Sequence, residues 1–286
     1  MKIALGTVQF GLEYGVANAQ GRVSRETAQE ILDVARDLGV DILDTAAAYG
    51  NSEQVLGRAG IGDFKVVSKV PPGEVYAQAP RQWIENCIHQ SLENLECNSL
   101  YGLLLHRPLE LLEPNGERLY AALLSAKQKG LVEKIGVSVY GPEDLEKLNH
   151  FHFDLVQAPM NILDRRLKNS GWLERLSLRG TEVHIRSAFL QGLLLMPDKR
   201  RPEYFAPWGA LLSEYDTWRK TKGLTPVQAC LGYLSSHPEI DRIVVGVDAP
   251  AQLKEIVAAV GTCLPSLPEA LQTSDPGLIN PALWKL

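Results

Sequence analysis

The chain has little of what would place it in a membrane, outside the cell or on nucleic acid. No run of about 18 apolar residues occurs, so we expect no membrane span. The opening residues Met1–Gly6 are too short for a secretory signal and are typical of a first strand. The formal net charge is −5, and the one basic block, Lys199–Arg201, is flanked by prolines. We therefore expect neither a membrane nor a nucleic acid as a partner.

Cysteine and metal-ligand patterns are also sparse. The four cysteines include no C-x-x-C pair, which favours free thiols in a reducing cytoplasm. His150 and His152 lie two residues apart with no Cys or third His nearby, which favours a surface turn over a metal site. With 45% apolar and 22% charged residues, the composition is that of a globular protein.

Strand-like and helix-like segments alternate along the whole chain. The expected strands are Lys2–Gly6, Val40–Asp44, Lys65–Lys69, Leu100–His106, Lys134–Ser138, Leu155–Ala158, Glu182–Ser187 and Arg242–Gly246. The expected helices are Arg25–Leu38, Pro80–Leu95, Gly116–Lys129, Pro142–Leu148, Asp164–Arg175 and Pro250–Val260.

This alternation predicts an α/β fold, a single (β/α)8 TIM barrel domain over residues 1–286. A doubly wound sheet is the competing architecture, but its Gly-x-Gly-x-x-Gly loop is missing after the first strand, and no helix is expected directly behind Gly6–Gly11. Residues 197–222 are an irregular insertion after the seventh strand. The insertion either overhangs the barrel mouth or forms a helix pair outside the barrel.

Three consecutive expected strands end in ionisable residues. Asp44 ends the second strand, with Tyr49 in the loop after it, and Lys69 and His106 end the next two strands. The carboxyl ends of barrel strands face the same mouth, so these four side chains are expected to meet there as a catalytic group.

The motifs that carry these residues resemble those of the aldo-keto reductase family over essentially the whole chain. They are Leu5-Gly6-Thr7, Asp44-Thr45-Ala46-Ala47-Ala48-Tyr49-Gly50 with Ser52-Glu53, Ser68-Lys69-Val70, Leu104-Leu105-His106-Arg107-Pro108, Ile135-Gly136-Val137-Ser138 and Gln157. The resemblance implies an NAD(P)H-dependent oxidoreductase that reduces a small-molecule carbonyl, with Tyr49 as general acid, Lys69 and Asp44 as its tuning pair, and His106 as the group that orients the substrate.

Elementary chemistry agrees with these roles. Carbonyl reduction requires a hydride for carbon and a proton for oxygen. A lysine ammonium favours the phenolate that remains after a tyrosine has given up its proton, and a carboxylate keeps that ammonium charged. A histidine can polarise the carbonyl through a hydrogen bond.

The same residue-by-residue matching implies a cofactor site for NADP(H) or NAD(H). Ser138 and Gln157 would bind the nicotinamide amide, and the first loop, the loop after the seventh strand and the last loop would line the rest. The residues are Gly6, Thr7, Gln9, Ser138, Gln157, Arg186, Ser187, Phe189, Gln191, Gly192, Gly246, Val247, Asp248, Gln252 and Glu255.

Arg186 departs from the family pattern, because many members place an aromatic ring there, stacked on the nicotinamide. Its guanidinium would stack on the nicotinamide and disfavour the oxidised cofactor, point at an acidic substrate, or pair with Asp or Glu in the barrel wall.

The last loop departs as well. Gly246 and Gln252 occupy the positions matched to basic residues that grip the ribose phosphate of NADPH, and Asp248 adds a negative charge. This pattern predicts a weakened NADPH preference and use of NADH, although Lys254 would restore some positive charge.

The substrate pocket is less well encoded. Its candidates are Phe10, Tyr14, Tyr49, Arg107, Arg186, Phe189, Gln191 and Trp208. This polar and aromatic mixture suits a sugar-like carbonyl better than a steroid. Three rival functions remain: a catalytically silent nicotinamide-binding sensor or subunit, an aldolase-type barrel with a Schiff base on Lys69, and a protein-binding scaffold that uses the insertion.

Overall fold

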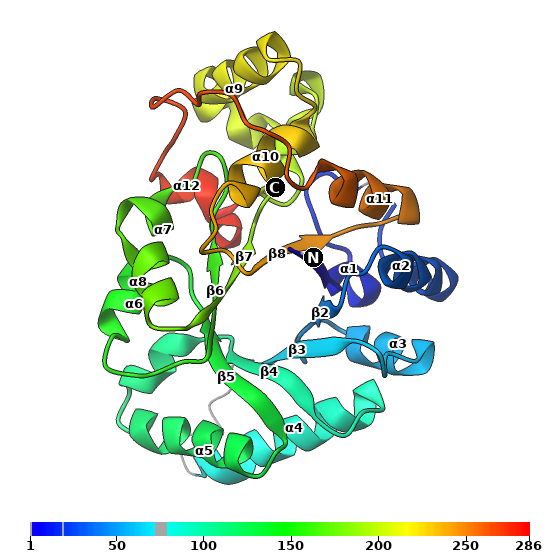
Figure 1. Cartoon of the computed structure of the whole chain (residues 1–286), viewed down its shortest axis with the longest axis vertical. Coiled ribbons are helices and arrows are strands. Elements are labelled where there is room, and N and C mark those ends of the chain that lie inside the picture. The colour runs from blue at the N-terminus through cyan, green and yellow to red at the C-terminus, as the bar shows by residue number, and fades with distance from the viewer. Residues whose placement is uncertain (1, 19, 72–78) are drawn as a thin grey trace.

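A closed barrel of eight parallel strands forms the centre of the molecule (Figure 1). The computed structural model describes residues 2–18, 20–71 and 79–286. Each strand pairs with its sequence neighbours, and β1 pairs with β8 to close the barrel. The strands are β1 (Ile3–Gly6), β2 (Ile42–Asp44), β3 (Lys65–Val70), β4 (Leu100–Leu105), β5 (Val132–Ser138), β6 (Leu155–Pro159), β7 (Glu182–Arg186) and β8 (Arg242–Gly246).

Helices surround the barrel (Figure 1). They are α1 (Val8–Gly11), α2 (Arg25–Asp37), α3 (Ser52–Ala59), α4 (Pro80–Leu95), α5 (Gly116–Gln128), α6 (Pro142–Lys147), α7 (Arg166–Asn169), α8 (Trp172–Leu178), α9 (Gly209–Thr221), α10 (Pro226–Ser235), α11 (Pro250–Ala259) and α12 (Pro276–Ile279). Short 3₁₀ helices form at Pro108–Leu112, Leu193–Leu195, Asp198–Arg200, Glu203–Trp208 and Pro281–Leu283.

The helices pack as their sequences predict. In α2, Ser24 caps the start by accepting a hydrogen bond from the Thr27 amide, and Ala28, Ile31, Leu32 and Ala35 form the buried stripe. Inside the barrel a small cluster fills the axis, made of Ala4, Ile42, Val67, Leu104 and Leu155. The larger core lies between strands and helices, so both faces of each strand are buried.

The prediction of a (β/α)8 barrel is confirmed, and the ends of the eight predicted strands differ from the observed ends by at most two residues. One predicted helix was wrong: residues 164–175 do not form a single helix. Gly171, with a φ of 77°, separates α7 from α8 there. The left-handed conformation at this glycine breaks the helical hydrogen-bond pattern. A one-turn helix, α1, also follows β1 where none was expected.

The insertion after β7 is more regular than its sequence suggests. Its second half forms α9, which lies on the outer side of α10 at the top of the view (Figure 1). The Tyr215 hydroxyl donates a hydrogen bond to the Pro226 carbonyl at the start of α10, and the Trp208 indole donates one to Asp275. The second half of the insertion therefore forms one helix that lies outside the barrel. Trp208, predicted as a pocket candidate, is not among the residues that line the cavity described below.

Candidate active site

The four residues predicted to be catalytic meet at the carboxyl ends of neighbouring strands. Asp44 is the last residue of β2, Lys69 is the fifth residue of β3, and His106 directly follows β4. Tyr49 lies in the loop between β2 and α3. Parallel strands in register bring such positions to one rim, so the local sequence of three strands builds the group.

Lys69 and Asp44 form a buried ion pair. The Lys69 ammonium donates to Asp44 Oδ1 at 2.7 Å and to the Thr45 carbonyl at 2.8 Å, and the lysine is 1% exposed. Burial acts to lower the pKa of Lys69, but the charge of Asp44, with Tyr49 and the hydrogen bonds to both, outweighs it and raises the pKa. Lys69 is therefore a charged group at neutral pH.

A chain of hydrogen bonds extends from this pair across the mouth. Gln157 Nε2 on β6 donates to Asp44 Oδ2 at 2.7 Å, and the Ser138 hydroxyl at the end of β5 donates to Gln157 Oε1 at 3.3 Å. Both oxygens of Asp44 are thus occupied. The two residues matched to the nicotinamide amide also fix the carboxylate that holds the lysine.

Tyr49 and His106 lie against the charged pair. The Lys69 ammonium is 5.0 Å from the Tyr49 ring centroid, and the Tyr49 and His106 rings meet edge to face at 6.2 Å. Burial, followed by the positive charges of Lys69 and Arg186, lowers the pKa of His106 to about 4. His106 is accordingly a neutral imidazole that carries one ring N–H at physiological pH.

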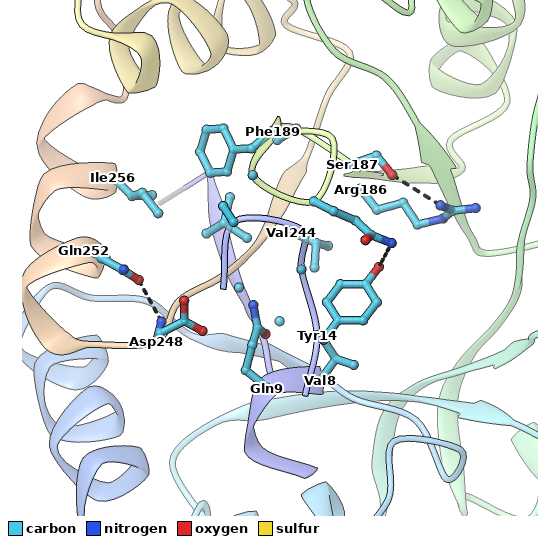
Figure 2. A pocket seen from close by; sticks show the side chains of 18 of the residues that line it. Val8, Gln9, Tyr14, Arg186, Ser187, Phe189, Val244, Asp248, Gln252 and Ile256 are labelled. Carbon is cyan, nitrogen blue, oxygen red and sulfur yellow. Dashed lines mark hydrogen bonds between the residues drawn. The ribbon is translucent and has the colours of Figure 1, made fainter. Parts of the chain in front are cut away.

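A cavity of about 480 Å³ opens beside this group (Figure 2). It runs between the loop after β1, the loop after β7 and the start of α11. The predicted residues that line it are Gly6, Thr7, Gln9, Tyr14, Asp44, Tyr49, Gln157, Arg186, Ser187, Phe189, Gln191, Gly192, Gly246, Asp248, Gln252 and Glu255.

Several predicted residues lie elsewhere. Phe10 is 1% exposed in the hydrophobic core, because α1 turns its ring inward. The sequence predicted Phe10 in the substrate pocket, but it does not line the cavity. Val247 is also in the core. Ser138, Lys69, His106 and Arg107 are outside the cavity lining, although Ser138 and Lys69 bond to residues within it.

The sequence reasoning missed the apolar part of the lining. Val8, Val244 and Ile256 line the cavity near Gln9 and Gln252 (Figure 2). Helical spacing was a usable signal for Ile256, because it lies one turn after Gln252 on α11. Val8 and Val244 carry no comparable signal, since a valine beside a strand end is equally typical of a core.

The loop after β7 has an unusual backbone. Ser187, Leu190 and Gln191 have φ values of 61°, 46° and 51°, and Gly192 has 92°. This loop meets the loop after β1: Gln191 Nε2 donates to the Tyr14 hydroxyl at 3.2 Å, and a Cβ on Gly192 would lie 2.5 Å from the Ala17 Cβ. The two loops therefore interlock at the edge of the cavity, and Gly192 permits that approach.

Arg186, the last residue of β7, turns its guanidinium toward the end of β5. It donates to the Val139 carbonyl at 2.9 Å and to the Ser187 hydroxyl at 3.3 Å, and its Cζ lies 4.9 Å from the Tyr140 ring centroid. Among residues 2–18, 20–71 and 79–286, Arg186 forms no ion pair. The hypothesis that it pairs with an acid of the barrel wall was wrong.

The last loop carries a half-buried acid. The Asp248 amide donates to Gln252 Oε1 at 2.7 Å, and burial raises the pKa of the Asp248 carboxyl. Its Oδ1 is buried without a hydrogen-bond partner in the described part of the chain, and so is Oε1 of Gln9, which also lines the cavity. Lys254 is exposed and outside the lining.

Metal sites and membrane spans are both missing from the described ranges. No group of three or more His, Cys, Asp or Glu side chains there is placed to hold a metal ion. No helix in those ranges is long and apolar enough to cross a membrane.

Comparisons with known proteins agree with this geometry. The model of the "Aldo/keto reductase family" matches residues 2–266. The chain is 25% identical to the "NADH-specific methylglyoxal reductase" of Escherichia coli, covering 91% of this chain and 89% of that protein. It is also 25% identical to the "L-glyceraldehyde 3-phosphate reductase" of Escherichia coli O157:H7, covering 91% and 87%. The holo form of an aldo-keto reductase from Bacillus halodurans has the same fold, with a TM-score of 0.71, 23% identity, and 92% and 88% coverage.

Proposed function

Because the chain belongs to the aldo/keto reductase family, whose members are oxidoreductases that use NAD(P)H, we propose that it reduces an aldehyde or ketone with Tyr49 as the general acid. The observation that carries this proposal is the buried Lys69–Asp44 pair beneath Tyr49, at the wall of a cavity large enough for a cofactor. A bound reduced nicotinamide supplies the hydride for the carbonyl carbon.

The proton for the carbonyl oxygen comes from the Tyr49 hydroxyl. The Lys69 ammonium stabilises the phenolate left behind, and Asp44 keeps that ammonium charged in its buried position. His106 is neutral at working pH, so it donates its ring N–H to the carbonyl oxygen and orients the substrate. In the net reaction the carbonyl gains one hydride and one proton and becomes an alcohol.

The same geometry counts against Schiff-base chemistry. A lysine nucleophile must be deprotonated, whereas Lys69 bonds to Asp44 at 2.7 Å and its pKa is raised. Borohydride trapping of a carbonyl compound on Lys69 would contradict this argument.

The residues present fit a nicotinamide cofactor. A Cβ on Gly246 would lie 2.4 Å from the Gln9 side chain, so the glycine leaves the space at the end of β8 that Gln9 occupies beside the cavity. Two buried oxygens that face the cavity, Gln9 Oε1 and Asp248 Oδ1, need donors. Residues from the loops after β1, β7 and β8 would hold the cofactor, with Ser138 and Gln157 near the nicotinamide.

Asp248 supports a preference for NADH. Its buried, unpaired Oδ1 would accept a hydrogen bond from a ribose hydroxyl, and its charge would repel the additional phosphate of NADPH. Fluorescence titration with each cofactor tests this preference, and tighter binding of NADPH by ten-fold or more would contradict it. Asp248→Ser should shift the ratio toward NADPH by about ten-fold, the effect of roughly 1.4 kcal/mol of charge repulsion.

We further propose a hydroxylated, sugar-like carbonyl as substrate. The reacting end of the cavity presents Tyr14, Gln191 and Arg186, which are hydrogen-bonding groups, beside Tyr49. Similar proteins are named for reducing methylglyoxal and glyceraldehyde 3-phosphate, which are short polar carbonyls.

The variant Tyr49→Phe tests the mechanism. It should lower kcat by at least about 10²-fold, because it removes the proton donor, while cofactor binding changes little. Tyr120→Phe is the matched control, since this tyrosine bonds to the His152 carbonyl outside the cavity. Retention of most activity by Tyr49→Phe would rule out the assigned role. Cofactor binding by the unaltered protein without turnover of any aldehyde would favour a silent sensor.

A further inference from the structure

We infer that the carbonyl substrate carries an anionic group, a carboxylate or a phosphate, which is bound by Arg186 at the cavity wall, with Arg107 adding positive charge beside His106. The inference rests on the proposed function, because it names the substrate class of the same site. The anion is the shared chemistry, and the substrates used to test it distinguish the two sources.

Arg186 is a cation at the cavity wall that has no counter-charge among the described residues. It is half-buried, and its described partners are a carbonyl, a hydroxyl and an aromatic ring, all of them neutral. Those contacts hold the planar guanidinium in place. Arg186 nevertheless lines the cavity, so a ligand there can reach it. A partly buried cation without an acid is costly unless a ligand supplies the negative charge. A guanidinium fixed in this way suits carboxylate and phosphate oxygens.

The charges around the reacting group leave this cation uncompensated. Lys69 and Asp44 cancel each other, and His106 is neutral. The remaining acids that line the cavity, Asp248 and Glu255, belong to the β8–α11 side. In Figure 2, Asp248 lies on the opposite side of the cavity from Arg186.

Arg107 adds a second positive charge beside the reacting group. It directly follows His106, is exposed, and forms no ion pair among the residues described. The neighbouring Glu110 neutralises it only in part, because burial raises the pKa of Glu110 to about 7. The charges of Arg186 and Arg107 both reach His106, where they add to burial in lowering its pKa. The position of the carbonyl oxygen is therefore electropositive, in a chain whose net charge is −5.

The rim near Arg186 is also suited to a polar ligand. Tyr14 and Tyr140 are 41% and 46% exposed, and the Tyr14 hydroxyl already accepts a hydrogen bond from Gln191. The Tyr14 proton remains available to an anionic oxygen. The rim thus presents donors. Among the described lining residues, the acid beside Tyr49 is Asp44, whose charge is already paired with Lys69.

Matched pairs of aldehydes test the inference. Glyceraldehyde 3-phosphate is compared with glyceraldehyde, and succinic semialdehyde with butanal, using the full chain and its preferred cofactor. The charged member of at least one pair should have a kcat/KM higher by about 10- to 100-fold, the range expected for one or two charge-assisted hydrogen bonds. The pair that shows the larger ratio identifies phosphate or carboxylate as the group bound.

Ionic strength provides a second measurement. The advantage of the charged substrate should shrink by several-fold when ionic strength rises from about 0.02 to about 0.3 M, because Arg107 is exposed and screened. The neutral member of each pair should respond little.

Arginine variants test whether Arg186 and Arg107 cause the preference for the charged substrate. Arg186→Gln and Arg107→Gln should each reduce the ratio of charged to neutral kcat/KM, with Arg186→Gln bringing it close to one. Arg58→Gln, on the exposed end of α3, removes the same charge far from the cavity lining and should leave the ratio unchanged. If Arg186→Gln does not fold, Arg107→Gln and the salt dependence decide the matter.

Two outcomes would overturn the inference and are distinguishable. Turnover of neutral aldehydes with less than about two-fold preference for either charged partner would refute the anionic substrate and leave the proposed function standing. Failure to reduce any of the four with either cofactor would refute both.

Discussion

At the scale of single residues, Asp44 organises the site, because each of its oxygens holds a different partner. Oδ1 accepts from Lys69 and Oδ2 accepts from Gln157, both at 2.7 Å, and the carboxylate is 4% exposed. Charges buried to this degree are tolerated only as a pair. In the proposed mechanism the acid therefore supports the chemistry of Tyr49, and its paired burial also stabilises the barrel mouth.

A double-mutant cycle should reveal this pairing. Asp44→Asn and Lys69→Met should each lower the free energy of unfolding by about 3–5 kcal/mol, because each leaves the other charge buried and unpaired. The double variant should be more stable than the sum predicts by more than about 1 kcal/mol. Urea denaturation measures all four proteins, and additive losses would show that the pair is not coupled.

The lowered pKa of His106 predicts how the stability of the protein depends on pH. Its pKa is about 4, below the ordinary 6.5, because of burial and the nearby cations. Protonation therefore favours the unfolded chain, where the pKa is higher. The contribution to stability is fully present above about pH 6.5 and is lost as the pH falls to about 4.

Urea denaturation between pH 4 and pH 7 checks this contribution. His106→Asn should show a weaker pH dependence than the unaltered protein over that interval. An NMR titration of His106 should find it neutral at pH 6, and a measured pKa near 6.5 would contradict the assignment of a neutral hydrogen-bond donor. His150, distant from the cavity lining, is the internal comparison.

At the scale of elements, the strands were predictable because their apolar runs end in polar residues, and a parallel register then brings Asp44, Lys69 and His106 to one rim. The direction of individual side chains was less predictable. Phe10 lies in the core because a single helical turn, α1, follows β1, and nothing in the composition of residues 6–11 announces that turn. Likewise, Gly171 divides α7 from α8 through a left-handed φ that the apolar pattern does not reveal.

The orientation of Arg186 was also outside the reach of the sequence. Its position at the end of β7 was correctly expected, but its partners are the Val139 carbonyl and the Tyr140 ring. A backbone carbonyl is available at every residue, so sequence patterns do not single out the one that a given arginine will bind.

The interlocked loops after β1 and β7 yield an element-scale prediction. Gly192→Ala should weaken cofactor binding by roughly ten-fold, because its Cβ would meet the Ala17 Cβ at 2.5 Å and push the loops apart. It should also cost about 1 kcal/mol of stability for its positive φ. Fluorescence titration and urea denaturation separate the two effects.

Gly180→Ala is the matched control for this change. Gly180 has a φ of 70°, but no atom lies within 4 Å of the point that an added Cβ would occupy, so the substitution introduces strain without contact. It should lose similar stability and keep the cofactor affinity. Equal affinity in both variants would show that the contact between the loops does not shape the cofactor site.

At the scale of the whole molecule, the C-terminal segment is hydrogen-bonded to the connection between β6 and α7. Arg165 Nη2 donates to the carbonyls of Pro268 and Leu271, at 3.2 and 2.6 Å, and the Thr273 amide donates to the Leu163 carbonyl. The Arg165 guanidinium thus joins two segments that are more than 100 residues apart in the sequence.

Arg165→Met should detach the C-terminal segment, because it removes the hydrogen bonds to the Pro268 and Leu271 carbonyls. Hydrogen exchange and proteolysis of residues 268–275 should quicken, while the affinity for the cofactor stays within about two-fold, because the segment lies outside the cavity lining. Asn169→Ala removes an exposed hydrogen bond to Gln272 and should have little effect. Unchanged protection in Arg165→Met would assign the anchoring to the other contacts.

The closure of the barrel by β1 and β8 has a consequence for biosynthesis. Ile3 pairs with Ile243, so β1 cannot form this pairing until β8 has been synthesised. At roughly 5–20 residues per second, the delay is on the order of ten seconds or more. During this interval one edge of β1 lacks its partner strand, and an unpaired strand edge is prone to aggregation. Asp44, Lys69 and His106 are translated before β8, whereas Gly246 and Asp248 of the proposed cofactor site come at and after its end, so the proposed site is complete only once β8 has been made.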